Sequence, residues 1–349
     1  GLVSLISTIK NHELLVWISV CITPYLWIYV LHNTITTQKR GERVLVVILI
    51  TIIGYFMLFA ISSLFGNVEP SAAYAGQYFQ NQELPNYRYT IMNIGSIISF
   101  GPILYDAGSN QLAAIASIGV LICCYYLIKE KVVFKLLFYS SLIVTGILFI
   151  ILMQSRAIFI AVIFSIILFL FLNRKFIVLL FLLLMFSTIV FIQNYDIFGL
   201  LYKYNLFKLA ELQAPLAEIG NYSFRLNFMI IALNDISIDP LGLGFNHYYN
   251  LFIDDSILYA NLLNGSGIVG FIIFILMMIY LFIKFIKGAL YFNMEIENRA
   301  LCNLGIALIV LMLISGFSTR YLFDLRIYSA LFWSIIGTIF SISDRWQEI

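Results

Sequence analysis

The stretch Ala157–Ile192 reads AIFIAVIFSIILFLFLNRKFIVLLFLLLMFSTIVFI, and it indicates a membrane protein. It consists of two apolar runs separated only by the polar turn Asn173-Arg174-Lys175. Each run approaches the roughly 20 apolar residues that a helix needs to cross the hydrocarbon of a bilayer. Hydrocarbon offers no hydrogen-bond partner to an open backbone, so such runs are expected to be helical. The stretch therefore predicts two transmembrane helices that reverse direction at Arg174.

The composition of the whole chain agrees with this interpretation. The 349 residues are 62% hydrophobic and 11% charged, and the mean hydropathy is +0.98. A soluble chain of this length would need far more charge to cover its surface. The net charge of +2 gives no reason to expect a nucleic-acid partner. The four cysteines, Cys21, Cys123, Cys124 and Cys302, all lie in apolar runs, so we expect small hydrophobic side chains rather than disulfides or metal ligands.

The same hydropathy pattern continues along the chain and predicts an all-α, polytopic membrane protein with about nine or ten transmembrane helices. One membrane domain over residues 1–349 is the expected organisation. Thr90–Asp106 is interrupted by Asn93, Gly95, Gly101 and Pro102, and it is interpreted as an interfacial segment. The expected spans are Leu14–Leu31, Val44–Phe65, Leu112–Ile128, Val132–Leu152, Ala157–Leu172, Phe176–Ile192, Gly267–Phe285, Ala300–Phe317 and Ile327–Ile342.

Basic residues occur in every second loop between these spans. Loops on the cytoplasmic side of a membrane carry an excess of Lys and Arg, so these loops are expected to be cytoplasmic. The alternate loops, including the long segment Gln193–Ser266, then face the other side. The basic loops hold Lys39, Arg40, Arg43, Lys129, Lys131, Lys135, Arg174, Lys175, Lys284, Lys287 and Arg299.

The long segment Gln193–Ser266 holds most of the polar residues that could support chemistry. Asp196–Glu218 is amphipathic, and we expect it to lie along the membrane surface. Further on, Ser223 is a plausible N-cap of a second amphipathic helix, which would put Arg225 in its first turn. A cation there is favourable if an anion also binds at that terminus. A surface arginine is the alternative interpretation of Arg225.

A turn-rich string follows that helix. Asp239–Gly244 reads DPLGLG, and its glycines Gly242 and Gly244 allow the backbone to approach a ligand closely. His247 follows the string and lies next to Tyr248. It is a candidate for proton transfer, with a solvated loop histidine as the alternative. A metal site of His247, Asp254 and Asp255 lacks the spacing of known ligand sets, so no metal is expected.

Three further arginines on the predicted outer side are candidates for a functional role. Arg156 follows Ser155 at the start of a span, where it is either an interfacial anchor or a functional cation. Arg320 and Arg88 are the other two, and they could form a second basic wall above the bilayer. Ion pairing of Arg320 with Asp324 is the alternative interpretation.

These motifs together resemble the O-antigen polymerase and O-antigen ligase superfamily of bacterial membrane glycosyltransferases. The resemblance covers about Met153–Phe274 and depends on the order and spacing of loose motifs. Ligases typically place a His-Asn pair shortly before the Gly-x-x-Gly start of the next span. Here that place holds Asp255-Ser256, which favours a polymerase. The motifs are Ser155-Arg156, Arg225, Asp239–Gly244, Asp255–Tyr259 and Gly267-Ile268-Val269-Gly270.

The resemblance implies a GT-C-like fold and glycosyl transfer on the periplasmic face of the bacterial inner membrane, without a metal or another cofactor. The donor and acceptor would both be oligosaccharides linked to undecaprenyl pyrophosphate, held in membrane lipid. A polysaccharide chain-length regulator is a further expected partner. Arg156 and Arg225 would bind the pyrophosphate, and His247 or Asp255 would accept the hydroxyl proton. Arg320, Arg88, Asp254, Tyr248, Gly242 and Gly244 are the expected substrate-binding residues.

Two other functions stay open from the sequence. An O-antigen ligase would transfer finished polysaccharide to the lipid A core. A flippase for lipid-linked oligosaccharide would carry charged residues inside its spans, along a path through the membrane. The spans of this chain are almost free of charge, and this favours chemistry at the surface.

Overall fold

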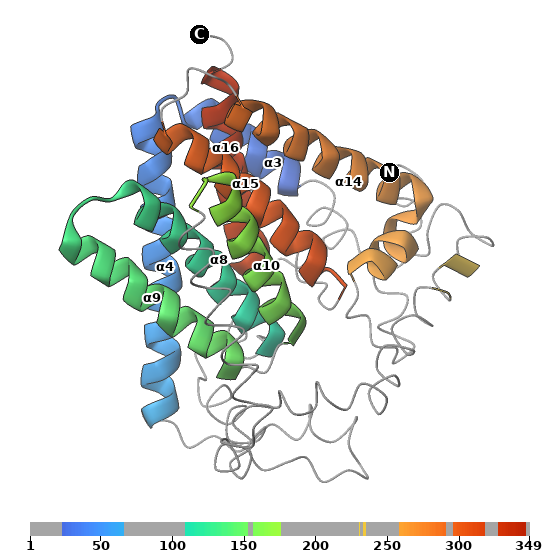
Figure 1. The fold of residues 1–349 in the computed structure, drawn as a ribbon. Helices are drawn as coiled ribbons and strands as arrows, with labels where there is room; N and C mark the ends of the chain where they lie inside the picture. The colour runs from blue at the N-terminus through green and yellow to red at the C-terminus, as the bar shows by residue number, and fades with distance from the viewer. Residues whose placement is uncertain are drawn as a thin grey trace, which may run out of the picture.

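The described part of the chain is a bundle of α-helices in the computed structural model, and it contains no β-strand (Figure 1). The helices in chain order are α3 (Thr23–Thr34), α4 (Gln38–Phe65), α8 (Ser109–Lys129), α9 (Val133–Leu152), α10 (Arg156–Leu172), α14 (Leu258–Leu290), α15 (Ile296–Ser315) and α16 (Ile327–Trp346). The structure describes residues 23–65, 109–152, 156–175, 230, 233–234, 258–290, 296–317 and 327–346.

Long apolar helices give the protein its membrane-embedded character. Within the described residues four helical segments are long and apolar enough to cross a bilayer, and a fifth apolar helix, Ala157–Leu172, is shorter. This is fewer than the roughly nine or ten spans expected from hydropathy. Phe176–Ile192 and Thr90–Asp106 lie outside the described residues, as does the first half of Leu14–Leu31. The four segments are Leu112–Lys129, Val133–Ile150, Leu262–Leu290 and Ile296–Ser315.

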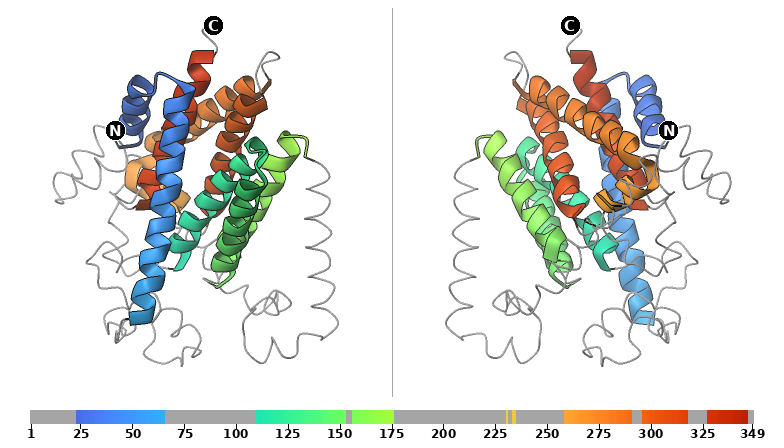
Figure 2. Two further views of the ribbon diagram at one scale, coloured as in Figure 1. Left: turned by 90° about the vertical axis from the view of Figure 1, so that its left-hand side faces the viewer. Right: turned by 90° about the vertical axis from the view of Figure 1, so that its right-hand side faces the viewer.

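Helix α15 lies at the centre of the bundle and packs against α8, α10, α14 and α16. Small side chains let its neighbours approach, as is common between membrane helices. Gly305 of α15 is an example, because the Phe285 ring of α14 packs directly against it. Figure 2 shows α4, the blue helix, running the length of the bundle, and it packs against α8 and α16.

Helices α8 and α9 are similarly apolar but occupy different environments. In the spanning part of α8, 83% of the residues are buried, against 6% in that of α9. Helix α9 covers the outside of α8, with large exposed side chains such as Phe134, Leu137 and Val144. We assign this face of α9 to lipid contact. The three cysteines in the described residues, Cys123, Cys124 and Cys302, are buried and free, as expected.

Most helix boundaries lie close to those expected, but two helices begin well before the expected residue. Helix α4 starts at Gln38, so Lys39, Arg40 and Arg43 belong to its first turns and not to a loop. Thr37 accounts for this start, because its hydroxyl accepts a hydrogen bond from the Arg40 amide at 3.3 Å, as an N-cap residue does. Helix α14 starts at Leu258, ahead of the expected Gly267.

Substitution of Gly305 tests the packing of α14 on α15. A Cβ at this position would lie 2.6 Å from the Phe285 ring, and Phe285 is fully buried, so Gly305→Ala must displace a core side chain. We expect a cost of roughly 1–3 kcal/mol and a lower Tm in detergent. Gly54→Ala is the control, because nothing lies within 4 Å of its Cβ position. A Tm for Gly305→Ala equal to that of Gly54→Ala would contradict the close packing.

Candidate functional site

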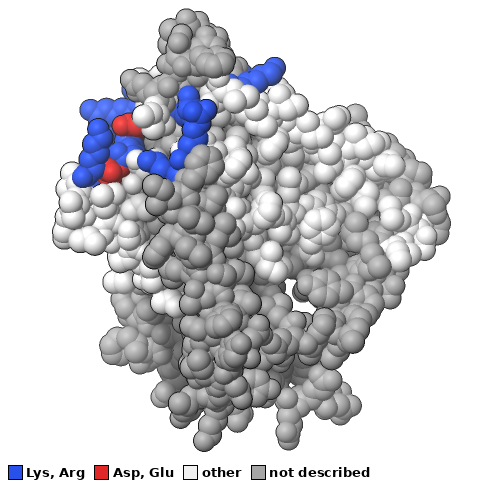
Figure 3. Space-filling model, viewed as in Figure 1, with Lys and Arg blue, Asp and Glu red and all other residues white. Residues whose placement is uncertain are grey.

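The charged side chains of the described residues gather at one end of the bundle, which we call the charged end. Figure 3 shows them over the end near the C-terminus, and the described surface further from that end carries no charge in this view. The Lys129 Nζ lies 2.5 Å from Glu42 Oε1 and 3.1 Å from Glu297 Oε2. These two ion pairs connect the start of α4, the end of α8 and the start of α15. Each of the three side chains is partly buried, which shields the pairs from solvent better than a fully exposed pair.

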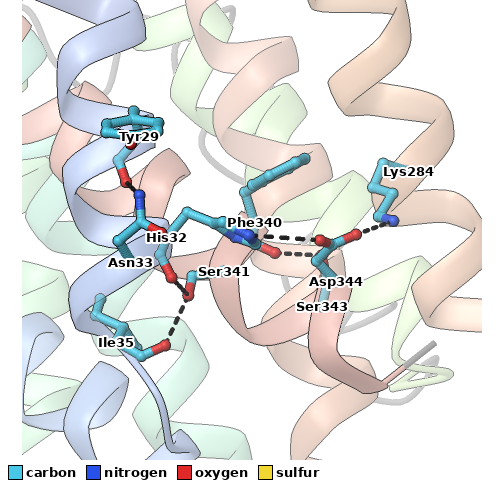
Figure 4. Close-up of polar contacts among 9 residues, drawn as sticks. All are labelled: Tyr29, His32, Asn33, Ile35, Lys284, Phe340, Ser341, Ser343 and Asp344. Carbon is cyan, nitrogen blue, oxygen red and sulfur yellow. Dashed lines mark hydrogen bonds and ion pairs between the residues drawn. The ribbon is translucent and has the colours of Figure 1, made fainter. Parts of the chain in front are cut away.

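A second cluster at the charged end joins three other helices (Figure 4). Asp344 of α16 forms an ion pair with Lys284 of α14, and its other carboxylate oxygen lies 3.8 Å from His32 Nε2 of α3. The Ser341 hydroxyl donates a hydrogen bond to the Ile35 carbonyl at 2.8 Å. These ion pairs and hydrogen bonds connect the ends of different helices. We therefore interpret the charged end as a structural feature that stabilises the bundle.

The starts of α10 and α14 lie at the opposite end of the bundle. Nearer the charged end, the Asn303 amide donates to Asn173 Oδ1 at 3.0 Å, which pairs the end of α10 with the first half of α15. Because an α-helix rises about 1.5 Å per residue, the two antiparallel helices bring the Arg156 backbone near the end of α15. The Leu258 amide donates to the Gly316 carbonyl at 2.9 Å, so α14 begins at the same end.

The sequence-predicted site is described only at its Arg156 position. Helix α10 begins at Arg156, so this arginine does stand at the start of a helix as predicted. The proposed roles of the other residues stay predictions. Arg88, Arg225, Gly242, Gly244, His247, Tyr248, Asp254, Asp255 and Arg320 lie outside the described residues.

Helix α14 contains a break that hydropathy did not predict. Gly267 has φ 68° and ψ −176°, a conformation essentially restricted to glycine. In the first half, Leu258–Ser266, the described side chains are buried in the protein. Beyond the break, Ile268 and Val269 are about half exposed, at 43% and 49%. The two halves meet at an angle, visible where the light orange segment turns into the long orange helix (Figure 1).

Local contacts explain the glycines around this break. The Ser266 hydroxyl donates to the Leu262 carbonyl at 2.7 Å, which keeps the side chain beside its own helix. A Cβ at Gly270 would lie 2.3 Å from that hydroxyl, so only glycine fits there. The Tyr259 hydroxyl donates to the Leu313 carbonyl at 2.5 Å and holds the first half on α15. The signal in the sequence was the string GSGIVG at 265–270, which the hydropathy interpretation treated only as the start of a span.

One polar side chain at the break lacks a hydrogen-bond partner within the described part of the chain. Asn264 is 3% exposed, and there neither its buried Oδ1 nor its buried Nδ2 has a partner. Unpaired buried amides are unusual because burial removes their hydrogen bonds to water. No group of three or more His, Cys, Asp or Glu side chains that could hold a metal occurs within the described ranges. The described residues at the break therefore offer hydrogen bonding by neutral groups.

Substitution of Gly267 tests whether the break is built into the backbone. An alanine at φ 68° and ψ −176° is strained, so we expect Gly267→Ala to cost roughly 1–3 kcal/mol. Thermal unfolding in detergent measures this cost, with Gly54→Ala again as the control in an ordinary helical position. If Gly267→Ala unfolds at the temperature of the control, the helix is continuous and the break is not a fixed feature.

Comparison with known proteins adds no family to these observations. No protein-family model matches the chain, and no curated protein matches it either.

Proposed function

We propose that the protein is a metal-independent glycosyltransferase that polymerises lipid-linked oligosaccharide repeat units at the periplasmic face of a bacterial inner membrane. One observation carries the proposal. Arg156 and the first half of α14 belong to two motifs far apart in the sequence, and both lie at the end of the bundle opposite the charged end. The order of the motifs between them supports the same function: Arg225, then Asp239–Gly244, then Asp255.

The distribution of charge supports the proposed orientation. The charged end carries the basic residues that the alternation of loops assigns to the cytoplasm. With that end in the cytoplasm, the starts of α10 and α14 face the periplasm. Undecaprenyl pyrophosphate carriers would hold both substrates in the membrane plane, and this confinement would raise their effective concentration at the site.

The proposed reaction joins the two lipid-linked substrates through one displacement. The hydroxyl oxygen of the acceptor sugar attacks the anomeric carbon of the donor, and the bond from that carbon to the pyrophosphate oxygen breaks. Undecaprenyl pyrophosphate leaves with the bonding electron pair, so negative charge develops on its oxygen. Arg156 and Arg225 are assigned to that charge, because a guanidinium can bind phosphate oxygens in a bidentate manner.

The hydroxyl proton needs an acceptor, and we assign this role to His247. A neutral imidazole has a reference pKa near ~6.5, which suits neutral pH better than a carboxylate near ~3.9. Asp255 is then assigned to orienting the acceptor sugar through hydrogen bonds. The proposed substrate-binding residues are Arg320, Arg88, Asp254, Tyr248, Gly242 and Gly244.

The central experiment reconstitutes the purified protein in liposomes with lipid-linked repeat units and separates the glycans on a gel. A ladder of lengths is the expected product. A ligase would form no ladder, and a flippase would form no new glycosidic bond. Arg156→Ala and Arg225→Ala are expected to reduce the ladder by about a hundredfold or more, with poor rescue by Lys.

The matched control for the arginines is Arg40→Ala at the charged end, where Arg40 donates a hydrogen bond to the Thr36 hydroxyl. This variant should keep full activity, because the residue lies far from the proposed chemistry. Full activity of Arg225→Ala would show that Arg225 is an ordinary surface arginine, and it would remove the main cation from the mechanism.

The same assay separates His247 from Asp255. We expect His247→Ala to lose turnover while donor lipid still binds, because only the proton acceptor is gone. Asp255→Asn should mainly raise the acceptor concentration needed for half-maximal rate. The reverse pattern, an active His247→Ala and an inactive Asp255→Asn that binds both substrates, would assign the base to Asp255.

A further inference from the structure

Two buried asparagines of the bundle have opposite hydrogen-bonding states. Asn303 of α15 is 1% exposed, and its amide donates to Asn173 Oδ1 at 3.0 Å. Asn264 of α14 is 3% exposed, yet neither of its amide atoms has a partner among the residues that the structure describes. Burial of an amide without hydrogen bonds is unfavourable, so a partner for Asn264 would stabilise the protein that binds it.

The position of Asn264 links this unpaired amide to the break in α14. Asn264 precedes Gly267 by three residues, and residues three apart lie on the same face of a helix. Broken helices inside membrane proteins occur where the backbone is enclosed by protein or lines a polar site. The described side chains around Asn264 are buried, whereas Ile268 and Val269, directly beyond Gly267, are about half exposed. The amide therefore lies within the protein, close to an interruption of the helix, and not against lipid.

The chemistry of the amide selects the class of partner. An asparagine side chain offers a carbonyl oxygen that accepts and an NH₂ group that donates. A phosphate ester offers acceptors only and would leave the carbonyl oxygen of Asn264 unpaired. A sugar hydroxyl or an acetamido group both donates and accepts, so it can satisfy both ends.

We propose that Asn264 binds a hydroxyl or acetamido group of the glycan in the lipid-linked substrate, as part of a sugar subsite beside the break in α14. This proposal rests on the proposed function, since it names a part of the same substrate. The two parts of the substrate are then bound by different residues. Asn264 in the helix bundle binds the sugar, and the arginines bind the pyrophosphate.

The test compares Asn264→Leu with Asn303→Leu in two measurements. The first is the Tm of the purified protein without substrate. Asn264→Leu removes an amide that has no partner, so its Tm should stay the same or rise. Asn303→Leu removes the donor to Asn173 Oδ1, so its Tm should fall.

The second measurement is binding of two probes to the protein in nanodiscs. One probe is undecaprenyl pyrophosphate without sugar, and the other is the lipid-linked repeat unit extracted from the producing bacterium. Asn264→Leu should weaken binding of the glycan-bearing lipid by about tenfold and leave binding of the sugar-free lipid unchanged. Asn264→Ser keeps a donor and an acceptor, so it should bind the glycan-bearing lipid better than Asn264→Leu.

Several outcomes would overturn the proposal. Equal loss of both lipids would assign Asn264 to the pyrophosphate or to the fold. A Tm of Asn264→Leu as low as that of Asn303→Leu would show that Asn264 already has an internal partner, such as a buried water. A wild-type ladder together with unchanged glycan binding by Asn264→Leu would remove this inference alone. If the wild type neither forms a ladder nor binds the glycan-bearing lipid, the proposed function fails with it.

Discussion

Backbone hydrogen bonding in hydrocarbon is the constraint on which the rest of this structure depends. A peptide group inside a bilayer has no water to bind, so each spanning segment must satisfy its own N–H and C=O groups as a helix. Side-chain hydroxyls follow the same requirement. The Ser117 hydroxyl donates to the Ala113 carbonyl at 2.9 Å, and the Ser165 hydroxyl donates to the Ala161 carbonyl at 2.7 Å. Both serines are fully buried, so a polar group is tolerated where a carbonyl one turn earlier accepts its hydrogen bond.

The break in α14 interrupts this pattern, and Asn264, whose amide has no hydrogen-bond partner among the described residues, lies beside it. The Ser266 hydroxyl donates a hydrogen bond to the Leu262 carbonyl, whereas the longer Asn264 amide has neither an acceptor nor a donor among the described residues. The cost of that arrangement is the physical reason to associate the break with a ligand. Features that disfavour the folded state are commonly kept where a protein binds or reacts.

The two ends of the bundle divide structure from proposed function. At the charged end, Lys129 and Asp344 each contact partners on two other helices, and together they join α3, α4, α8, α14, α15 and α16. This fixes the helix ends on one side of the membrane. The opposite end, where α10 and α14 begin, is left to carry the proposed chemistry, and the glycine break adds a polar group to it.

The sequence alone determined the helical class, the bounds of α8, α9, α10, α15 and α16 to within a few residues, and the gathering of basic residues at one end. These properties depend on the length of apolar runs and on where charge interrupts them. The candidate site residues other than Arg156 also come from the sequence alone, since they lie outside the described residues. Only the tertiary structure decided that α8 is buried while the similarly apolar α9 faces outward, because lipid and protein interior select the same side chains. It also decided that α14 begins at Leu258, and that Asn303 is paired while Asn264 is not. Partners of a polar group come from other helices, and the spacing of residues along one chain does not contain that information.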